Sequence, residues 1–409
     1  MRTRFRPRRS GLPAFTLVAP AVLAILSSSI PATAGPFTGL GDLPGGSFDS
    51  HAQGISAVGS VVVGDSNSTS GFEAMRWTPG GGIAGLGDLP GSSFDSIAFA
   101  VSADGSVAVG RSQGNAPAEH AFRWSAATGM VDLGTLGGNS SVGLGVSNFG
   151  SVVVGNSDSA LGTQAFMWTA GGGIAGLGAL PGGSFFFSAA NGVSADGQVI
   201  VGQSRSASGN EAFRWTAASG MVGMGDLPGS IFSSAALAAS ANGSVIAGWG
   251  TDSAGKTEAF RWTASGGMQP LGDLPGGAFF SVANAVSGDG LTVVGRSNVG
   301  PTGLDDAAFI WDQAHGMRNL RSLLISNYGV DLTGWKLSSA TGVNGDGTQI
   351  VGFGTNPQGG PEAWFVDLAA APVPEPASMI VWSGLALITS CWSWRLRFYL
   401  GGVVRKAAA

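Results

Sequence analysis

One unit of about 47 residues recurs through the middle of this chain, and it limits the available folds more than any other feature. Most copies close on a short aromatic segment such as AMRW, AFRW or AFMW. The closing tryptophans are 47, 44, 47, 47 and 49 residues apart, at Trp77, Trp124, Trp168, Trp215, Trp262 and Trp311. A seventh copy ends at EAWFV, where Val366 takes the place of the tryptophan. Self-similarity at a fixed period of this length is typical of propellers, solenoids and other repeat arrays.

Each copy contains four short segments with the composition of β-strands. In the second copy they are GLGDL before Pro90, IAFAVS before Asp104, SVAVG after it and HAFRW ending at Trp124. Asp-Gly and Asn-Gly pairs between them fit two-residue hairpin turns. Four antiparallel strands per copy, repeated seven times, predict an all-β fold, a seven-bladed β-propeller over residues 35–369. Solenoid coils of about 20–30 residues and sandwiches of about 100 do not match the period.

The two ends of the repeat region predict how the ring closes. The first copy begins with a GLGDL segment at Gly39, whereas the seventh ends at residues 363–368 with no further segment to pair with. We therefore expect the first strand to complete the seventh blade. An open superhelical array is the alternative.

Composition excludes several classes of function. Only 11% of residues are charged, the net charge is −5, and no Lys/Arg cluster lies outside the two termini, so the chain lacks the basic face of a nucleic-acid-binding protein. The single cysteine, Cys391, excludes a disulfide framework and a multi-cysteine zinc site. The histidines His51, His120 and His315 occupy non-equivalent places without metal-binding spacing. The sequence thus predicts no catalytic residue, no metal and no cofactor.

Arginines and aspartates recur together within the repeat. An arginine precedes the closing tryptophan in several copies, and an aspartate follows in the next LGDL segment. Where the arginine is replaced by Met167, the aspartate slot holds Ala179; Arg123 opposite Thr135 is an exception. Loss of one member of a buried ion pair leaves the other charge unpaired. We therefore predict structural cross-strand ion pairs, with a ring of arginines gripping an acidic sugar as the functional alternative. The predicted pairs are Arg76 with Asp88, Arg214 with Asp226, and Arg261 with Asp273.

The amino terminus has the pattern of an export signal. Five arginines in the first nine residues precede an apolar stretch from about residue 12 to residue 26. Ala32 and Ala34 supply small residues for cleavage, so we predict a signal peptide over residues 1–34. An uncleaved membrane anchor is the alternative.

The carboxyl terminus has the pattern of a membrane anchor. Residues 377–394 are mostly apolar and uncharged, long enough for one transmembrane helix. Arg395 and Arg397 follow directly and predict a membrane stop on the cytoplasmic side.

Residues 370–409 resemble a PEP-CTERM sorting signal. The sorting motif Val373, Pro374, Glu375 and Pro376 stands before the apolar segment, and arginines follow it. The resemblance implies that an exosortase-type sorting protease processes the chain and that the product reaches the bacterial cell surface or exopolysaccharide matrix. The tail after the arginines, FYLGGVVRKAAA, is longer than this family usually carries.

The repeat itself resembles the HAF family of extracellular repeats. His120, Ala121 and Phe122 match its short motif directly, and the EAF segments of other copies vary its first position. This likeness covers most of residues 39–366. It implies an extracellular location and no particular activity.

The polar connection between the third and fourth segments differs most between copies, at residues 65–72, 156–163, 296–306 and 353–361. Variable loops on a rigid scaffold are the usual place for recognition, so we predict that a ligand or matrix polymer binds this rim. Drift of tolerant loops is the alternative.

Taken together, these patterns predict an exported, surface-sorted, non-catalytic protein with a structural or adhesive role in the envelope or exopolysaccharide matrix. A glycan-processing enzyme, lyase or hydrolase, is the alternative; it would need two acids across the propeller mouth, for which Asp305 and Asp306 are the best candidates. A periplasmic sensor would need an output module, and few residues follow the apolar helix.

Overall fold

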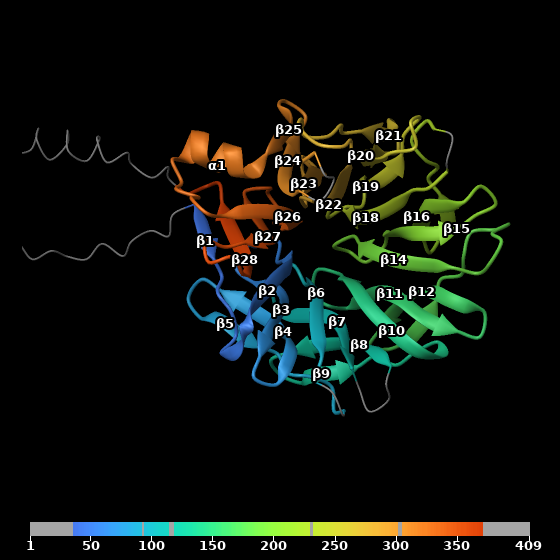
Figure 1. The fold of residues 1–409 in the computed structure, drawn as a ribbon. Helices are drawn as coiled ribbons and strands as arrows, with labels where there is room; N and C mark the ends of the chain where they lie inside the picture. Colours follow the sequence, from blue (N-terminus) through green and yellow to red (C-terminus); the bar gives the residue numbers. More distant parts are fainter. Residues whose placement is uncertain (1–35, 92–93, 114–117, 230–231, 302–304, 371–409) are drawn as a thin grey trace, which may run out of the picture. The chain divides into compact units, whose positions relative to one another are not determined.

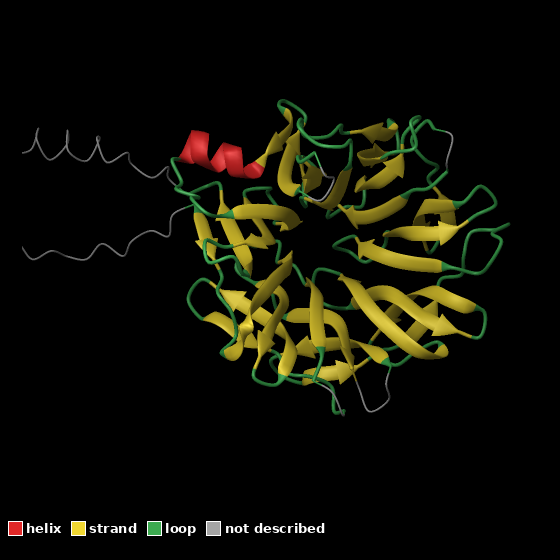
Figure 2. Cartoon of the chain, viewed as in Figure 1, coloured by secondary structure: helices red, strands yellow, loops and turns green. Residues whose placement is uncertain are grey.

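The computed structural model describes residues 36–91, 94–113, 118–229, 232–301 and 305–370. In these residues seven four-stranded antiparallel sheets surround a common axis (Figure 1), so the predicted seven-bladed β-propeller is confirmed. Helix in the described part of the chain is limited to α1 (Leu320–Tyr328), on the outside of the ring beside β25 and β26 (Figure 2).

Each of the first six blades is built from four consecutive strands, numbered from the axis outward. Blades one to three contain β2 (Gly45–Ile55), β3 (Val62–Ser68), β4 (Gly71–Thr78), β5 (Gly82–Gly85); β6 (Ser96–Val101), β7 (Val107–Gln113), β8 (Glu119–Ser125), β9 (Gly129–Asp132); and β10 (Gly137–Val146), β11 (Val152–Ser159), β12 (Gly162–Thr169), β13 (Gly173–Gly176). Blades four to six contain β14 (Ser188–Val193), β15 (Ile200–Arg205), β16 (Asn210–Thr216), β17 (Gly220–Gly223); β18 (Ala235–Ala239), β19 (Val245–Thr251), β20 (Thr257–Thr263), β21 (Gly267–Pro270); and β22 (Ser281–Val286), β23 (Thr292–Asn298), β24 (Asp306–Asp312), β25 (Gly316–Asn319).

The seventh blade joins the two ends of the repeat region. Its strands are β26 (Lys336–Val343), β27 (Gln349–Thr355), β28 (Pro361–Asp367) and β1 (Phe37–Gly39). Phe37 pairs with Val366 and Gly39 pairs with Trp364, antiparallel. The ring therefore closes as predicted, with the first described strand completing the last blade (Figure 1).

The LGDL segment, however, is not the strand that the sequence predicts. The outermost strand of blade one, β5, ends at Gly85, and residues 86–91 then cross to the innermost strand of the next blade. Gly87 has a φ of 81°, a left-handed conformation that glycine adopts readily and that ends the strand. Leu86 and Leu89 are buried between the blades. The segment is thus a packed connection that joins one sheet to the next.

A β-bulge in the innermost strand explains why a glycine recurs in the second strand of every copy. Each innermost strand carries a bulge, between Ala98 and Ala100 in the second blade. Next to it, a Cβ atom on Gly110 would lie 1.8 Å from the carbonyl oxygen of Ile97. No side chain fits there, so glycine is required. The corresponding glycines Gly64, Gly155, Gly202, Gly248, Gly295 and Gly352 meet the same obstruction, at 1.8–2.0 Å from a carbonyl oxygen.

Buried serines join neighbouring blades. Ser96 is fully buried at the start of β6; its Oγ accepts a hydrogen bond from the Ala74 N–H at 2.9 Å and donates to the Gly87 carbonyl at 2.7 Å. The same two bonds are made by Ser50, Ser141, Ser188, Ser234 and Ser281. In the seventh copy Leu337 occupies this slot, in an apolar cluster that includes Leu320 and Leu324 of α1.

Both predicted targeting segments lie outside the described residues. These are the signal peptide 1–34 and, apart from residue 370, the sorting segment 370–409 with Val373, Pro374, Glu375, Pro376, the predicted helix 377–394, Arg395 and Arg397. Within the described residues, no helix has the length and apolar character needed to cross a membrane.

Candidate functional site

The predicted arginine–aspartate ion pairs do not form in the structure. Arg261 donates from Nη2 to the Gly290 carbonyl at 3.2 Å, and Arg123 donates from Nε to the Gly150 carbonyl at 3.2 Å. Both carbonyls belong to hairpin turns of the next blade. Arg214 likewise lines a cavity together with the turn at residues 242–244. Arg123 and Arg261 therefore contact the neighbouring blade at the rim that carries the Asp-Gly turns.

The aspartates cap backbone groups at the opposite rim. Asp88 accepts hydrogen bonds from the backbone N–H of Leu89 at 3.0 Å and of Asp95 at 3.1 Å. Asp226 accepts from three backbone N–H groups, and burial raises its pKa, as it does for Asp273. The predicted ion pairs were wrong because the outermost strand lies earlier in the sequence than predicted. Arg76 lies opposite Ala84 in β5, and Asp88 follows four residues later, after the strand has ended.

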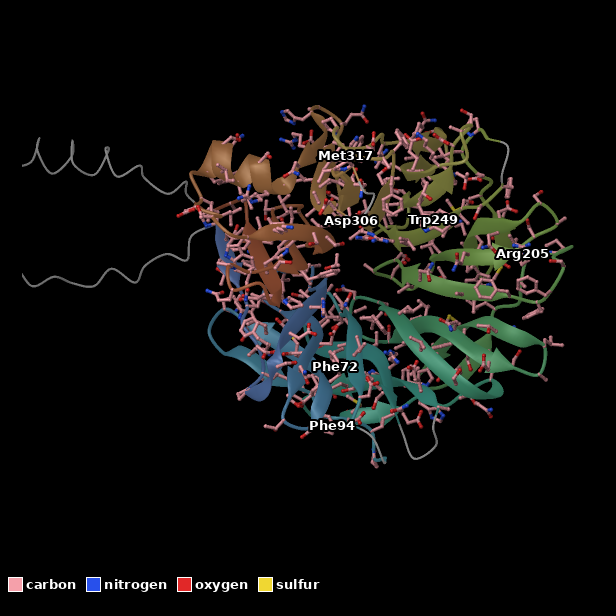
Figure 3. All side chains as sticks on the ribbon, viewed as in Figure 1. Phe72, Phe94, Arg205, Trp249, Asp306 and Met317 are labelled. Atoms are coloured by element: carbon pink, nitrogen blue, oxygen red, sulfur yellow. The ribbon has the colours of Figure 1, made fainter. Side chains whose placement is uncertain are left out.

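The candidate acids Asp305 and Asp306 line a groove of about 630 Å³ between the sixth and seventh blades, on the rim with the variable loops. Asp306 Oδ2 accepts a hydrogen bond from Arg296 Nη1 at 2.8 Å, so this carboxylate is already paired. Arg321, in the same groove, donates to the carbonyls of Trp335 and Leu332. Figure 3 shows Asp306 close to the central opening of the ring and Phe94 at its outer edge.

A second cavity, of about 430 Å³, lies on the propeller axis. Every innermost strand contributes the residue at its β-bulge, and we call these seven residues the axial ring. The side chains of Arg296 and Phe353 from second strands also line the cavity. The axial ring consists of Gln53, Phe99, Leu144, Asn191, Leu237, Asn284 and Thr341.

Three polar members of the axial ring are held by the neighbouring blade. Asn191 Nδ2 donates to the Ala236 carbonyl and Asn284 Nδ2 donates to the Ala340 carbonyl, each at 2.8 Å. Thr341 Oγ1 donates to the carbonyl of Ala52 at 2.7 Å. Each bond crosses from one innermost strand to the next, so the side chains are fixed in place before any ligand arrives.

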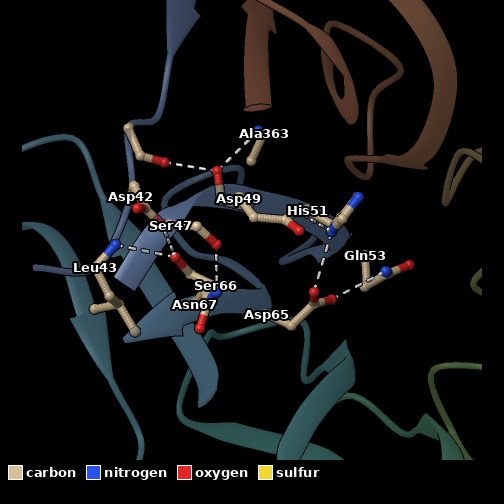
Figure 4. Close-up of polar contacts among 12 residues, drawn as sticks. Asp42, Leu43, Ser47, Asp49, His51, Gln53, Asp65, Ser66, Asn67 and Ala363 are labelled. Carbon is tan, nitrogen blue, oxygen red and sulfur yellow. Dashed lines mark hydrogen bonds and ion pairs between the residues drawn. The ribbon is translucent and has the colours of Figure 1, made fainter. Parts of the chain in front are cut away.

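An ionisable cluster stands beside the axial ring in blade one (Figure 4). His51 Nδ1 lies 3.1 Å from Asp65 Oδ2 and 3.5 Å from Asp49 Oδ1, and Gln53 Nε2 donates to Asp65 Oδ1 at 3.3 Å. The hydrogen bond with Asp65 raises the pKa of His51, and burial raises the pKa of Asp49. The ring of His51 also meets the ring of Phe353 edge-on, with centroids 4.8 Å apart. No group of three or more acidic, histidine or cysteine side chains in the described ranges is placed to hold a metal ion.

Two residues from second strands that line the axial cavity, Arg296 and Phe353, were missed by the sequence reasoning, although their slot in the repeat carries a signal. In the second strand of most copies a glycine and a serine enclose one residue that changes from copy to copy, as in VGDS, VGRS, VGNS and VGQS. Comparing the copies slot by slot, instead of loop by loop, would have found this position. Its members are Asp65, Arg111, Asn156, Gln203, Trp249, Arg296 and Phe353.

The closed ring of seven four-stranded sheets defines the chain as a seven-bladed β-propeller. No protein-family model matches the chain, and neither does any curated protein sequence.

Similar folds occur among solved structures. An oligogalacturonate lyase from Vibrio parahaemolyticus is similar with a TM-score of 0.50 and 9% identity, over 84% of this chain and 95% of that one. A prolyl endopeptidase is similar with a TM-score of 0.49 and 13% identity, over 79% of this chain and 51% of that one. TolB from Acinetobacter baumannii is similar with a TM-score of 0.44 and 13% identity, over 63% of this chain and 62% of that one. The match therefore covers less than two thirds of TolB. At these identities the likeness concerns the fold alone.

Proposed function

We propose that this propeller is exported, sorted to the cell surface, and acts there as a non-catalytic structural or adhesive component that binds a polymer of the envelope or exopolysaccharide matrix. The observation that carries the proposal is the order of segments at the carboxyl terminus. The motif Val373–Pro376 precedes an uncharged apolar stretch, and Arg395 and Arg397 follow it directly.

The predicted sequence of events uses both termini. Residues 1–34 direct export, and residues 377–394 hold the chain in the membrane until an exosortase-type protease acts at the sorting motif. The propeller then presents its axial cavity and its groove to the surrounding polymer. A β-propeller suits this role because its closed ring fixes the positions of many loops at once.

Sorting is tested by cell fractionation of a bacterium that carries an exosortase. We expect the wild-type protein in the surface or matrix fraction, and replacement of Pro374, Glu375 and Pro376 by alanine should leave it in the membrane fraction. Replacing Arg395 and Arg397 by glutamine should also impair sorting, whereas lysine at both positions, which keeps the charge, is the matched control. A triple-alanine variant that sorts like the wild type would refute the proposal.

Binding without catalysis is tested on exopolysaccharide extracted from the same bacterium. The wild-type protein should sediment with the polymer, and the number of reducing ends or unsaturated sugars should stay constant during incubation. Release of such ends by the protein, but not by a heat-inactivated sample, would instead establish the alternative, a glycan-processing enzyme.

A further inference from the structure

The copies of the repeat differ from one another at the positions that face the axis. Structural slots keep their residue: the glycine beside the bulge is present in all seven copies, and the interblade serine in six. The axial ring instead holds a glutamine, a phenylalanine, two leucines, two asparagines and a threonine. A position with only a packing role would be expected to keep one residue type in equivalent surroundings. The variation therefore points to a ligand.

The axial cavity offers two kinds of surface, hydrogen-bond acceptors and aromatic rings. Asn191 and Asn284 use Nδ2 to bind the next blade, and their Oδ1 atoms accept no hydrogen bond from any described residue. Both side chains are half-buried in the cavity lining, so these oxygens are fixed acceptors for a ligand with hydroxyl groups. Phe99 and Phe353 add aromatic surface to the same cavity. Together they suit a molecule with hydroxyl edges and an apolar face.

The charges around the cavity already have partners. Arg296 pairs with Asp306 at 2.8 Å and lies over the ring of Phe280, 5.3 Å from its centroid. Asp65 is nearly buried and contacts His51 at 3.1 Å. A charged ligand would have to compete with these pairs, whereas an uncharged one would not. The volume of about 430 Å³ is within the range of small-molecule sites.

We propose that the axial cavity binds an uncharged saccharide unit, one or two sugar rings of the polymer, through the amide oxygens of Asn191 and Asn284 and the faces of Phe99 and Phe353. The inference rests on the proposed function, because it names the part of the polymer that the propeller recognises. It places the binding site on the propeller axis, whereas the sequence predicted a site on the variable loops.

Isothermal titration calorimetry on the purified full-length protein tests the site with cellobiose, maltose and lactose, and with cellobiouronic acid as an acidic counterpart. At least one neutral disaccharide should bind saturably, and cellobiouronic acid should bind more weakly than cellobiose. No saturable binding of any neutral disaccharide, or tighter binding of the acid, would overturn the inference.

Two variants locate the binding. Asn191→Leu removes one acceptor and introduces the residue that blades three and five carry in the same slot, so the fold should tolerate it. Leu144→Trp fills part of the cavity. Each should weaken binding by about tenfold or more. Leu161→Trp, on a hairpin of the same blade and 69% exposed, is the matched control and should bind like the wild type.

The variants also separate this inference from the proposed function. If both axial variants bind the disaccharide like the wild type, or if Leu161→Trp loses binding equally, the axial site is wrong. If the two axial variants also sediment with exopolysaccharide like the wild type, polymer binding stands and only its location is refuted. If the wild-type protein does not sediment with exopolysaccharide at all, the binding function proposed above is refuted.

Discussion

Replacing Ser96 by alanine should destabilise the propeller strongly for so small a change. The hydroxyl is fully buried and makes two hydrogen bonds, from the Ala74 N–H and to the Gly87 carbonyl. Alanine leaves the buried N–H without an acceptor, at a cost of about 1–3 kcal/mol, and removes a second bond that contributes about 1 kcal/mol. We therefore expect the free energy of unfolding to fall by about 2–4 kcal/mol.

Urea unfolding followed by tryptophan fluorescence measures this loss. With a slope of about 3 kcal/mol per molar urea, the midpoint should fall by roughly 1 M. Ser70→Ala, at an exposed turn of blade one, is the matched control and should change the free energy by less than about 0.5 kcal/mol. If the two variants unfold at the same urea concentration, the interblade serines do not stabilise the ring and the reasoning is wrong.

Two further substitutions test other parts of the fold. Gly110→Ala should cost at least about 4 kcal/mol or prevent folding, because its Cβ would lie 1.8 Å from the Ile97 carbonyl, whereas Gly80→Ala meets nothing within 4 Å; soluble yield and urea midpoint distinguish them. The raised pKa of His51 means that its bond to Asp65 stabilises the fold fully below the unfolded-state pKa of about 6.5, and that this contribution is lost as the pH rises through the folded-state value. The urea midpoint should therefore fall from pH 6 to pH 9, and less so in His51→Gln; an equal fall in both proteins would contradict this assignment.

The repeat period predicted the fold because a propeller blade needs a fixed number of short strands, and their lengths and turns are visible in sequence. It predicted ring closure for a similar reason, since the last copy lacks an outer strand. The strand boundaries near Gly87 were wrong because the left-handed φ of one glycine cannot be read from a pattern that also fits a strand.

The arginine–aspartate error has a different origin. Arg261 and Asp273 recur together because both belong to the repeat, yet each binds backbone groups at its own rim, as Gly290 shows for the arginine. Joint occurrence inside a repeat therefore does not imply contact. The axial ring was missed because its residues lie at a bulge, where the alternation of inward and outward side chains is interrupted.

The pairing of β1 with β28 sets the order in which this molecule can be completed. Phe37 is among the first residues of the propeller to be synthesised, and its partner Val366 is among the last. Six sheets can form as the polypeptide grows, but the final seam has to wait for the whole domain, which is the kind of distant contact that slows folding. A truncated chain that ends before residue 361 would therefore keep a free strand at one end and an unfinished sheet at the other.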